Sequence, residues 1–480
     1  MTMRWQLAWP WLRPETYTAL LSLHGSIMVF FVVIPLLTNA FGYALIPRLI
    51  NAPGMAFPRL GAAGFWLLLL AGLAMMAGVF LPGGGVQAGW TGYPPLAAMR
   101  LSRSGLDAQA AWFVSLLIFS ISTLCTATDI LVTIVARRRS MRLLEMSMTV
   151  WSQLITAAIS LLATPVLIAA LLMSLTDHLT VQIGVSDYRI TSFFLPDGWS
   201  PQNQFTGASG GGDPILWQHL FWFYAHPAVY IMILPAMGLV SDILAFYSHK
   251  RLAGYRIIIG CMVAIAVLGF VVWAHHMFQS GLNPTIGSLF SLTTMLIAVP
   301  SALEVFNWLA TLWGGRIRLT VPMLHALGFV SLFVIGGMSG IFLAAPAINI
   351  QLHDTYFVVA HIHYVLFGGS LFGIFAGLTH WFTPLTGRLL YRGLGYAHFW
   401  LTFVSFNCAF LAMHLLGASG FPRRVAGYTN YESFAHYASL NVFITISAFV
   451  LGASQLLLAI NLIGSLIWGK REPLQTAVVD

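Results

Sequence analysis

The chain has 480 residues, of which 58% are hydrophobic and only 8% are charged. This composition and a mean hydropathy of +0.83 exclude a soluble globular protein and indicate an integral membrane protein. The formal net charge of +8 does not indicate a nucleic-acid partner, because most Arg and Lys residues lie in short loops between apolar runs. The three cysteines lie singly within apolar runs, so they predict neither a disulfide framework nor a thiolate metal site.

Apolar runs long enough to cross a bilayer recur along the whole chain. Such runs must form helices, because lipid offers their backbone groups no hydrogen bonds. We therefore predict an all-α fold, a polytopic membrane bundle of about eleven transmembrane helices in a single domain, 1–480. The expected spans are 16–48, 62–81, 110–136, 150–176, 214–247, 255–279, 287–313, 320–345, 355–384, 394–418 and 436–469.

Basic loops set the expected orientation. The runs 137–139, 250–251 and 470–471 fall on one side of the alternating spans, which the positive-inside rule assigns to the cytoplasm. An odd number of spans then places the N-terminus outside and the C-terminus in the cytoplasm. We expect a bacterial cytoplasmic membrane, and the short segment before the first span does not resemble a cleavable signal peptide.

The first span carries His24, followed by Gly25, which permits the close approach of a bulky group. Taken alone, a histidine packed inside the bundle explains this position better than a metal ligand does.

The fifth and sixth spans carry three more histidines. His226 and Tyr230 are four residues apart and share a helix face, while His275 and His276 end the sixth span. Three imidazoles with an open position suit copper, and a phenol beside a metal-bound imidazole can supply a proton and an electron. A packed aromatic stripe is the alternative interpretation of the fifth span.

The ninth span contains His361 and His363. Residues two apart on a helix point about 200° apart, so the two imidazoles address different partners on opposite faces. Neutral imidazole is a common ligand of iron and copper, and this arrangement suits two hemes on either side of one helix. The alternative is a pair of hydrogen-bonded histidines.

Three motifs make the chain similar to a known family: His-Pro-Ala-Val-Tyr at 226–230, Trp-Ala-His-His-Met-Phe at 273–278, and Val-Phe-Asn-Trp-Leu-Ala-Thr-Leu-Trp-Gly-Gly at 305–315. From about Leu23 to Trp468 the sequence resembles subunit I of the heme–copper oxidase superfamily, in the branch that contains cytochrome c oxidase. The resemblance implies two hemes and one copper ion, called copper B. The implied ligands are His24 and His363 for the low-spin heme iron, His361 for the high-spin heme iron, and His226, His275 and His276 for copper B, with Tyr230 covalently joined to His226.

The same resemblance implies polar sites on the outer face. Arg423, Arg424 and Trp90 match residues near the heme propionates, and guanidinium forks suit carboxylates. His353 and Asp354 match ligands of a magnesium ion shared with subunit II. For this pair alone, a structural hydrogen bond is an equally good interpretation.

Departures from the family pattern concern proton transfer. The chain has no room for the family's usual first helix, so a small subunit in its place is a further expectation. The family's carboxylates and amides of the D-type proton pathway are replaced by Gly54, Gly61, Ala62 and Ala228. Glu304 stands where the family has a lysine, and Asp129 is a second deep carboxylate without an assigned role. A modified K-type route to Tyr230 would use Ser241, Asp242, Ser301 and Glu304.

The resemblance therefore predicts the catalytic subunit of a terminal oxidase that reduces oxygen to water and pumps protons weakly or not at all. Thr16 and Ala19 replace polar quinol-binding residues, which favours cytochrome c or another small carrier as donor, through a copper-bearing subunit II. One alternative is a nitric oxide reductase, with a non-heme iron in place of copper B. A transporter with a histidine relay is the other, and it would show no heme absorption. The heme type stays open.

Overall fold

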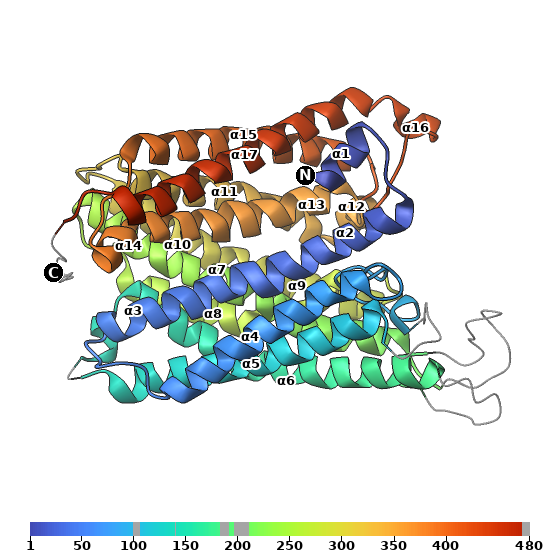
Figure 1. The fold of residues 1–480 in the computed structure, drawn as a ribbon, viewed down its shortest axis with the longest axis horizontal. Helices are drawn as coiled ribbons and strands as arrows, with labels where there is room; N and C mark the ends of the chain where they lie inside the picture. Colours follow the sequence, from blue (N-terminus) through green and yellow to red (C-terminus); the bar gives the residue numbers. More distant parts are fainter. Residues whose placement is uncertain (99–105, 140, 183–191, 196–210, 473–480) are drawn as a thin grey trace.

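The computed structural model describes residues 1–98, 106–139, 141–182, 192–195 and 211–472. Within them the chain forms an α-helical bundle whose long helices run roughly along one common direction (Figure 1). Outside the helices, the described residues include two isolated β-bridges, Thr355 with Pro422 and Arg388 with Arg471. The predicted all-α class is confirmed.

Ten helical stretches in the described residues are long and apolar enough to cross a membrane. They are Pro14–Leu49 (α2 Pro14–Ser26, η1 Ile27–Val33, η2 Leu36–Ala40, α3 Phe41–Leu49), Pro58–Phe80 (α4 Pro58–Ala77, η3 Gly78–Phe80), α5 Ala108–Arg137, α6 Met148–Gln182, α7 Pro214–Ser248, Pro284–Leu312 (α9 Pro284–Leu296, α10 Ala298–Leu312), α11 Val321–Ala344, Tyr356–Thr386 (α13 Tyr356–His363, η7 Tyr364–Leu371, α14 Phe372–Thr386), α15 Arg392–Ala418 and α17 Ala438–Trp468. Shorter elements are α1 Thr2–Ala8, α12 Pro346–Leu352, α16 Glu432–Ala435, η4 Leu96–Ala98 and η5 Leu143–Glu145.

The expected sixth span, 255–279, is the exception to regular helix. Its α-helix, α8, covers Tyr255–Leu268, and a separate 3₁₀ segment, η6, covers Trp273–Met277. The break begins at Gly269, where a Cβ atom would lie 2.8 Å from the Tyr230 ring. Regular α-helix thus ends beside Tyr230 of α7, before His275 and His276, which periodicity alone does not predict.

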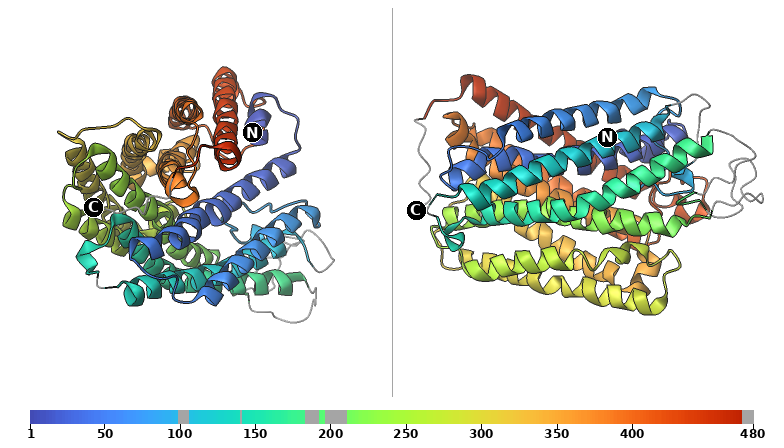
Figure 2. Two further views of the ribbon diagram at one scale, coloured as in Figure 1. Left: turned by 60° about the vertical axis from the view of Figure 1, so that its left-hand side comes forward. Right: turned by 90° about the horizontal axis from the view of Figure 1, so that it is seen from below.

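Helix α7 forms the core of the bundle. In the most apolar 18-residue part of α7, 72% of the residues are buried, which is the highest share among the ten stretches. Helices α6, α10, α11 and α14 pack against it (Figure 2). Pro227 and Pro235 lie inside it, which a buried membrane helix tolerates because its neighbours satisfy the freed backbone groups. Gly238 meets Ser152 of antiparallel α6 at a distance that leaves no space for a Cβ atom.

One end of the bundle gathers basic loops. Arg388 pairs with Arg471 through a β-bridge, Lys250 donates to the Trp313 carbonyl at 2.6 Å, and Arg137 donates to the Ala56 carbonyl at 3.4 Å. The end of α17 lies here, while α1 lies toward the opposite end (Figure 1). The basic loops thus share one end, and its assignment to the cytoplasm stays a prediction.

Candidate metal centre

Three imidazoles meet between α7 and η6. The ligating atoms of His226, His275 and His276 all lie within 4.8 Å of one another. His226 Nδ1 is 3.2 Å from His276 Nε2. Two nitrogens bound to one metal at about 2.0 Å and a near-tetrahedral angle are about 3.3 Å apart, so this spacing fits a shared ion.

Neighbouring groups leave nitrogen lone pairs of this trio free. The Thr294 hydroxyl of α9 donates to the Phe290 carbonyl at 2.5 Å, so it accepts from His275 Nδ1 at 3.1 Å. Nε2 of His275 then carries the lone pair. Nε2 of His226 is buried without a hydrogen-bond partner in the described part of the chain. A metal ion between the rings would use Nε2 of His275 and, from the spacing above, Nδ1 of His226, so it would not satisfy the unpaired Nε2 of His226. The hydrogen bond from His275 to Thr294 is of the kind that orients metal-binding imidazoles.

Aromatic rings fix the trio from one side. Trp222, one turn before His226 on α7, stacks on His276 with centroids 3.7 Å apart and planes 10° apart. Tyr230, one turn after His226, has its ring centroid 4.9 Å from that imidazole. Because residues four apart share a helix face, α7 presents an indole, an imidazole and a phenol in one column. The predicted proximity of His226 and Tyr230 is present, while their covalent bond stays a prediction.

His361 points away from His363, toward α11. Its Nδ1 lies 3.0 Å from the Gly336 carbonyl and 3.0 Å from the Ser339 hydroxyl. Since a carbonyl can only accept, Nδ1 carries the hydrogen and Nε2 is left as a ligand atom. A Cβ atom at position 340 would sit 3.0 Å from the His361 ring, so Gly340 also leaves room for this imidazole.

His363 faces His24 across the bundle. Its Nδ1 donates to the Val359 carbonyl at 2.7 Å, and Phe410 of α15 stacks on its ring at 4.4 Å. The His24 and His363 rings are 6.4 Å apart by centroid, with planes 10° apart. Two metal–nitrogen bonds of about 2 Å each, plus half of each ring, account for this separation. The pair therefore fits axial ligation of one iron, and the two histidines two residues apart do face different partners.

Trp90 lies between the two groups of histidines. Its indole is the neighbour that requires glycine at position 25, because a Cβ atom there would lie 2.9 Å from it. The same ring contacts Trp222 edge-on, with centroids 5.9 Å apart. The space beside Gly25 is thus filled by a protein side chain. Through Trp90, the helix of His24 is linked to the ring that stacks on His276.

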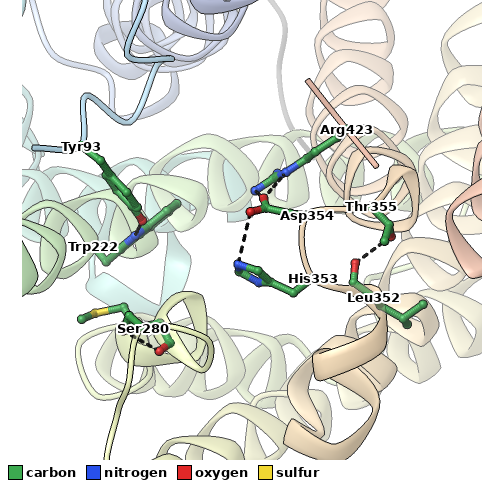
Figure 3. A network of polar contacts seen from close by, with 9 residues as sticks. Tyr93, Trp222, Ser280, Leu352, His353, Asp354, Thr355 and Arg423 are labelled. Atoms are coloured by element: carbon green, nitrogen blue, oxygen red, sulfur yellow. Dashed lines mark hydrogen bonds and ion pairs between the residues drawn. The ribbon is translucent and has the colours of Figure 1, made fainter. Parts of the chain in front are cut away.

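At the end of the bundle away from the basic loops, Asp354 and Arg423 form an ion pair (Figure 3). Asp354 Oδ1 accepts from Nε of Arg423 at 2.6 Å and lies 2.5 Å from its Nη2. The other oxygen, Oδ2, is 3.7 Å from Nε2 of His353. Asp354 therefore has one oxygen held by Arg423 and one directed toward His353, which accommodates both the structural and the magnesium interpretation.

Burial and neighbouring charged groups at this end of the bundle shift the pKa values of Asp354 and His353. Burial alone would raise the pKa of the Asp354 carboxyl, but the neighbouring Arg423 guanidinium outweighs it and holds that pKa below its usual range. Burial lowers the pKa of His353, and the two arginines lower it further. His353 therefore offers a neutral imidazole, the form that binds metals. Arg424 adopts a left-handed conformation with φ of 67° and lies near Gly89.

The predicted proton-route residues occupy separate environments. Glu304 is fully buried on α10, and neither carboxylate oxygen has a hydrogen-bond partner in the described residues. Ser301 lies one turn earlier, partly buried. Trp308, one turn later, donates to the Ser241 hydroxyl at 2.8 Å. Asp242 accepts hydrogen bonds from the Thr149 hydroxyl at 2.6 Å and from two backbone amides at the start of α6.

Several supporting residues could not be found from the sequence. Thr294 and Ser339 are single hydroxyls in apolar helices, where such residues are common, and their roles depend on which helix packs opposite. The position of Trp222 in the sequence did indicate proximity to the site, because Trp222 precedes His226 by one helical turn. Phe410 carried none, since it is one aromatic residue among many on α15.

Comparisons with known proteins agree with this geometry. The family model "Cytochrome C and Quinol oxidase polypeptide I" matches residues 1–450. Cytochrome c oxidase subunit 1 of Synechocystis is 43% identical over 98% of this chain and 80% of its own length. An alternative cytochrome c oxidase subunit 1 of Bradyrhizobium diazoefficiens is 41% identical over 98% of this chain and 78% of its own.

A solved structure shares the fold. The cryo-EM structure of a heme-copper terminal oxidase dimer superimposes with a TM-score of 0.77 at 18% identity, covering 98% of this chain and 81% of that one. The site and fold define a helical membrane oxidoreductase subunit built around buried imidazoles. The chain belongs to the cytochrome c and quinol oxidase polypeptide I family, as the sequence predicted.

Proposed function

We infer that this chain is the catalytic subunit I of a terminal respiratory oxidase, which reduces oxygen to water. The observation that carries this inference is the trio His226, His275 and His276 beside Tyr230, in a chain over 40% identical to subunits named as cytochrome c oxidases. Those names favour oxygen over nitric oxide as substrate. A nitric oxide reductase is kept only as an outcome of the test below.

The two hemes and the copper ion of the family can each be assigned to particular residues of this chain. His24 and His363 would hold the low-spin heme iron, His361 the high-spin heme iron, and the trio copper B. When bound, these metals supply the electrons and the open coordination position for oxygen. Within the described residues, hydrogen bonds occupy Nδ1 of His275, His361 and His363 and leave Nε2 of each with its lone pair, while Nδ1 of His226 faces His276. These contacts support the assignment. The heme type stays open.

The chain's own contribution to chemistry centres on Tyr230. Its ring lies next to His226, on the side of α7 that also bears Trp222. A phenol at this place can give a proton and an electron to the bound substrate, then recover both. His361, His275 and His276 are held by hydrogen bonds or ring contacts, so the site is preorganised and needs no rearrangement.

Partners follow from the family. Subunit I of heme–copper oxidases works with subunit II in a lipid bilayer. We further propose that a copper-bearing subunit II passes electrons from cytochrome c or another small carrier, and that it meets this chain at the end bearing His353 and Asp354. A magnesium ion there would use Asp354 Oδ2 and His353, whose orientation supports it. A small accessory subunit stays a prediction.

Protons for water formation need a path through the bundle. We propose that Glu304, with Ser301, Ser241 and Asp242, serves a route to Tyr230, and that outward pumping is weak or absent. Glu304 is fully buried and has no hydrogen-bond partner among the residues that the structure describes, which supports a role beyond stability, because such a group is costly.

One set of measurements tests the proposed function. We expect the purified complex to contain two hemes and one copper per chain, with low-spin and high-spin optical signals, and to consume oxygen with reduced cytochrome c. Nitric oxide turnover with iron in place of copper would assign the protein to the reductases. A preparation without heme absorption would leave only a transporter.

A further inference from the structure

A small polar cavity lies inside the membrane-spanning part of the bundle, between η2, α5 and α6. Its volume is about 10 Å³, enough for one water molecule. Seven of its ten lining residues have polar side chains, and Thr126, Gln153, Thr156 and Ser160 among them are almost completely buried. Such a concentration of polar groups is unusual at this depth, because each must find a hydrogen-bond partner.

Two oxygen atoms of the cavity lining have no such partner. Gln153 donates through Nε2 to the Leu37 carbonyl at 2.7 Å, but its Oε1 is buried and unpaired in the described residues. The Thr156 hydroxyl is also buried and unpaired there. Both side chains are 1% exposed. Because these two oxygens line a space of the size of a water molecule, a bound water would satisfy both.

A carboxylate is connected to one end of this cavity. Tyr43 donates to Asp129 Oδ2 at 3.0 Å and also lies within hydrogen-bonding reach of the Thr126 side chain, which lines the cavity. Asp129 Oδ1 accepts from the Phe57 amide at 2.8 Å, in the loop before α4. That loop lies at the end of the bundle with the basic residues, where Arg137 contacts Ala56. Asp129 thus links the loop region with the interior.

Gly61, one of the positions where this chain lacks a polar residue of the family, lies beside the Tyr43–Asp129 pair. A Cβ atom at 61 would lie 2.8 Å from the Tyr43 hydroxyl and 3.1 Å from Asp129 Oδ2. The asparagine that the family has at this place could not coexist with the Tyr43–Asp129 pair as it stands. The absence of a larger side chain at 61 and the presence of Tyr43 beside Asp129 are therefore sterically coupled.

The other end of the cavity continues along α6. Gln153, Thr156, Ser160 and Thr164 follow one another at intervals of three or four residues, so they form one polar face. The Thr164 hydroxyl is again buried without a partner in the described residues.

This polar face reaches the depth of the histidine trio. Ser152 packs on Gly238 of antiparallel α7. Thr164 follows Ser152 by twelve residues and His226 precedes Gly238 by twelve, so both lie about 18 Å further along the bundle. The face therefore ends at the level of His226.

We propose that Asp129, Tyr43, the water-holding cavity and the polar face of α6 form a proton-uptake path toward the metal centre, in place of the polar groups absent at 54, 61 and 62. This inference rests on the proposed function, since an oxidase consumes protons at that centre. The Asp129 carboxylate accepts a proton and releases it through the Tyr43 hydroxyl. Each following hydroxyl and water accepts one proton and passes on another, so no net charge stays in the path.

Three variants and one control test the path. Asp129→Asn keeps an acceptor for the Phe57 amide but cannot carry the proton. Thr156→Val removes one unpaired hydroxyl at nearly constant volume, and Ala157→Cys places one sulfur atom, about the size of a water molecule, in the cavity. Ser120→Ala is the matched control, because Ser120 is a fully buried α5 serine that donates to the Leu116 carbonyl of its own helix and does not line the cavity.

We expect oxygen turnover at least tenfold slower in Asp129→Asn and Ala157→Cys, and at least fivefold slower in Thr156→Val, with parental turnover in Ser120→Ala. Heme spectra and the rate of low-spin heme reduction should not change. Parental turnover in Asp129→Asn with normal spectra would overturn the path. If that variant loses its hemes, Thr156→Val decides in the same way.

A second readout does not depend on activity. A cryo-EM map that resolves water should show density between Gln153 Oε1 and Thr156 Oγ1, and an empty cavity would overturn the proposal. A parental protein that consumes no oxygen would instead refute the proposed function, and the water density would still decide whether the cavity is hydrated.

Discussion

The imidazole planes of His24 and His363 lie 10° from parallel, with ring centroids 6.4 Å apart, although the two residues are separated by most of the chain. The hydrogen bond from His363 Nδ1 to the Val359 carbonyl and the contact with Phe410 hold one of these rings independently of the other. The two ligands of the expected low-spin heme can therefore be removed one at a time.

Replacing His24 by Ala should abolish the low-spin heme spectrum and leave the high-spin spectrum in place. The reason is that His361 depends on Gly336 and Ser339 of α11, which do not contact His24. Optical and paramagnetic resonance spectra of the purified variant measure both signals. A normal bis-histidine signal in His24→Ala would contradict the assignment.

Tyr230→Phe should reduce oxygen turnover at least a hundredfold while heme and copper contents stay at parental values. The change removes only the hydroxyl, so the ring contact with His226 is retained. A hundredfold loss corresponds to about 2.7 kcal/mol of activation free energy. Oxygen consumption by the purified variant at the parental rate would argue against a role of this phenol in oxygen cleavage.

Glu304→Gln should slow oxygen turnover more than tenfold, which corresponds to about 1.4 kcal/mol or more. Glutamine keeps the shape of the side chain but cannot titrate, and Glu304→Lys, which restores the family residue, should recover part of the rate. Turnover in reconstituted vesicles measures the effect. An unchanged rate in Glu304→Gln would remove this residue from the route, and strong proton ejection by the parent would disprove weak pumping.

Asp242→Ala should lower the free energy of unfolding by about 1–3 kcal/mol, because the start of α6 would lose the carboxylate that accepts from the Thr149 hydroxyl and two amides. Asp242→Asn keeps an acceptor and should lose less. Thermal unfolding in detergent compares the two variants. Equal stability of Asp242→Ala and the parent would show that these bonds contribute nothing.

A pH series can test Asp107, the residue before α5. Burial would raise the pKa of this carboxyl, but hydrogen bonds from His178 and the Ala110 amide outweigh it, so its folded pKa lies below 3.8. Its stabilising contribution is then complete above the unfolded pKa and is lost as the pH falls through the folded pKa. Asp107→Ala should unfold at a lower temperature than the parent at pH 7, by about 1 kcal/mol of cap stabilisation. The difference should shrink only below about pH 3.8, and a difference that vanishes at pH 6 would contradict the assignment.

Sequence patterns were sufficient for the class of fold and for the three histidines that meet between α7 and η6, but they did not single out the buried His178, His325 and His398. An imidazole in a hydrocarbon-like run is conspicuous because ionisable groups are costly there. The same argument singled out Glu304 and Asp129. The all-α bundle, the family and the oxidase function are confirmed, while the individual ligand roles stay predictions.

Contacts between residues on different helices could not be predicted from the sequence in the same way. Tyr43 and Asp129 are 86 residues apart, and nothing in either segment indicates that they pair. Gly61 was visible as a lost polar residue, but its steric reason depends on both of them. The regular period of a helix also concealed the break after Leu268, because the residues on both sides are equally apolar.

Each of the two helices that carry the expected low-spin heme ligands changes winding directly after its histidine. The π-helical segment Ile27–Val33 follows His24 by three residues, and Tyr364–Leu371 follows His363 immediately. A π turn holds one more residue than an α turn, and such segments are common at functional sites. Removing one residue from either segment, with a return to ordinary α-helical winding, would therefore leave everything beyond it in nearly the same rotational position relative to the histidine. The distance in sequence between a ligand and the distant half of its helix can therefore change by one residue at these two places, and alignments of such subunits should accept single-residue gaps here better than in the regular α-helical parts.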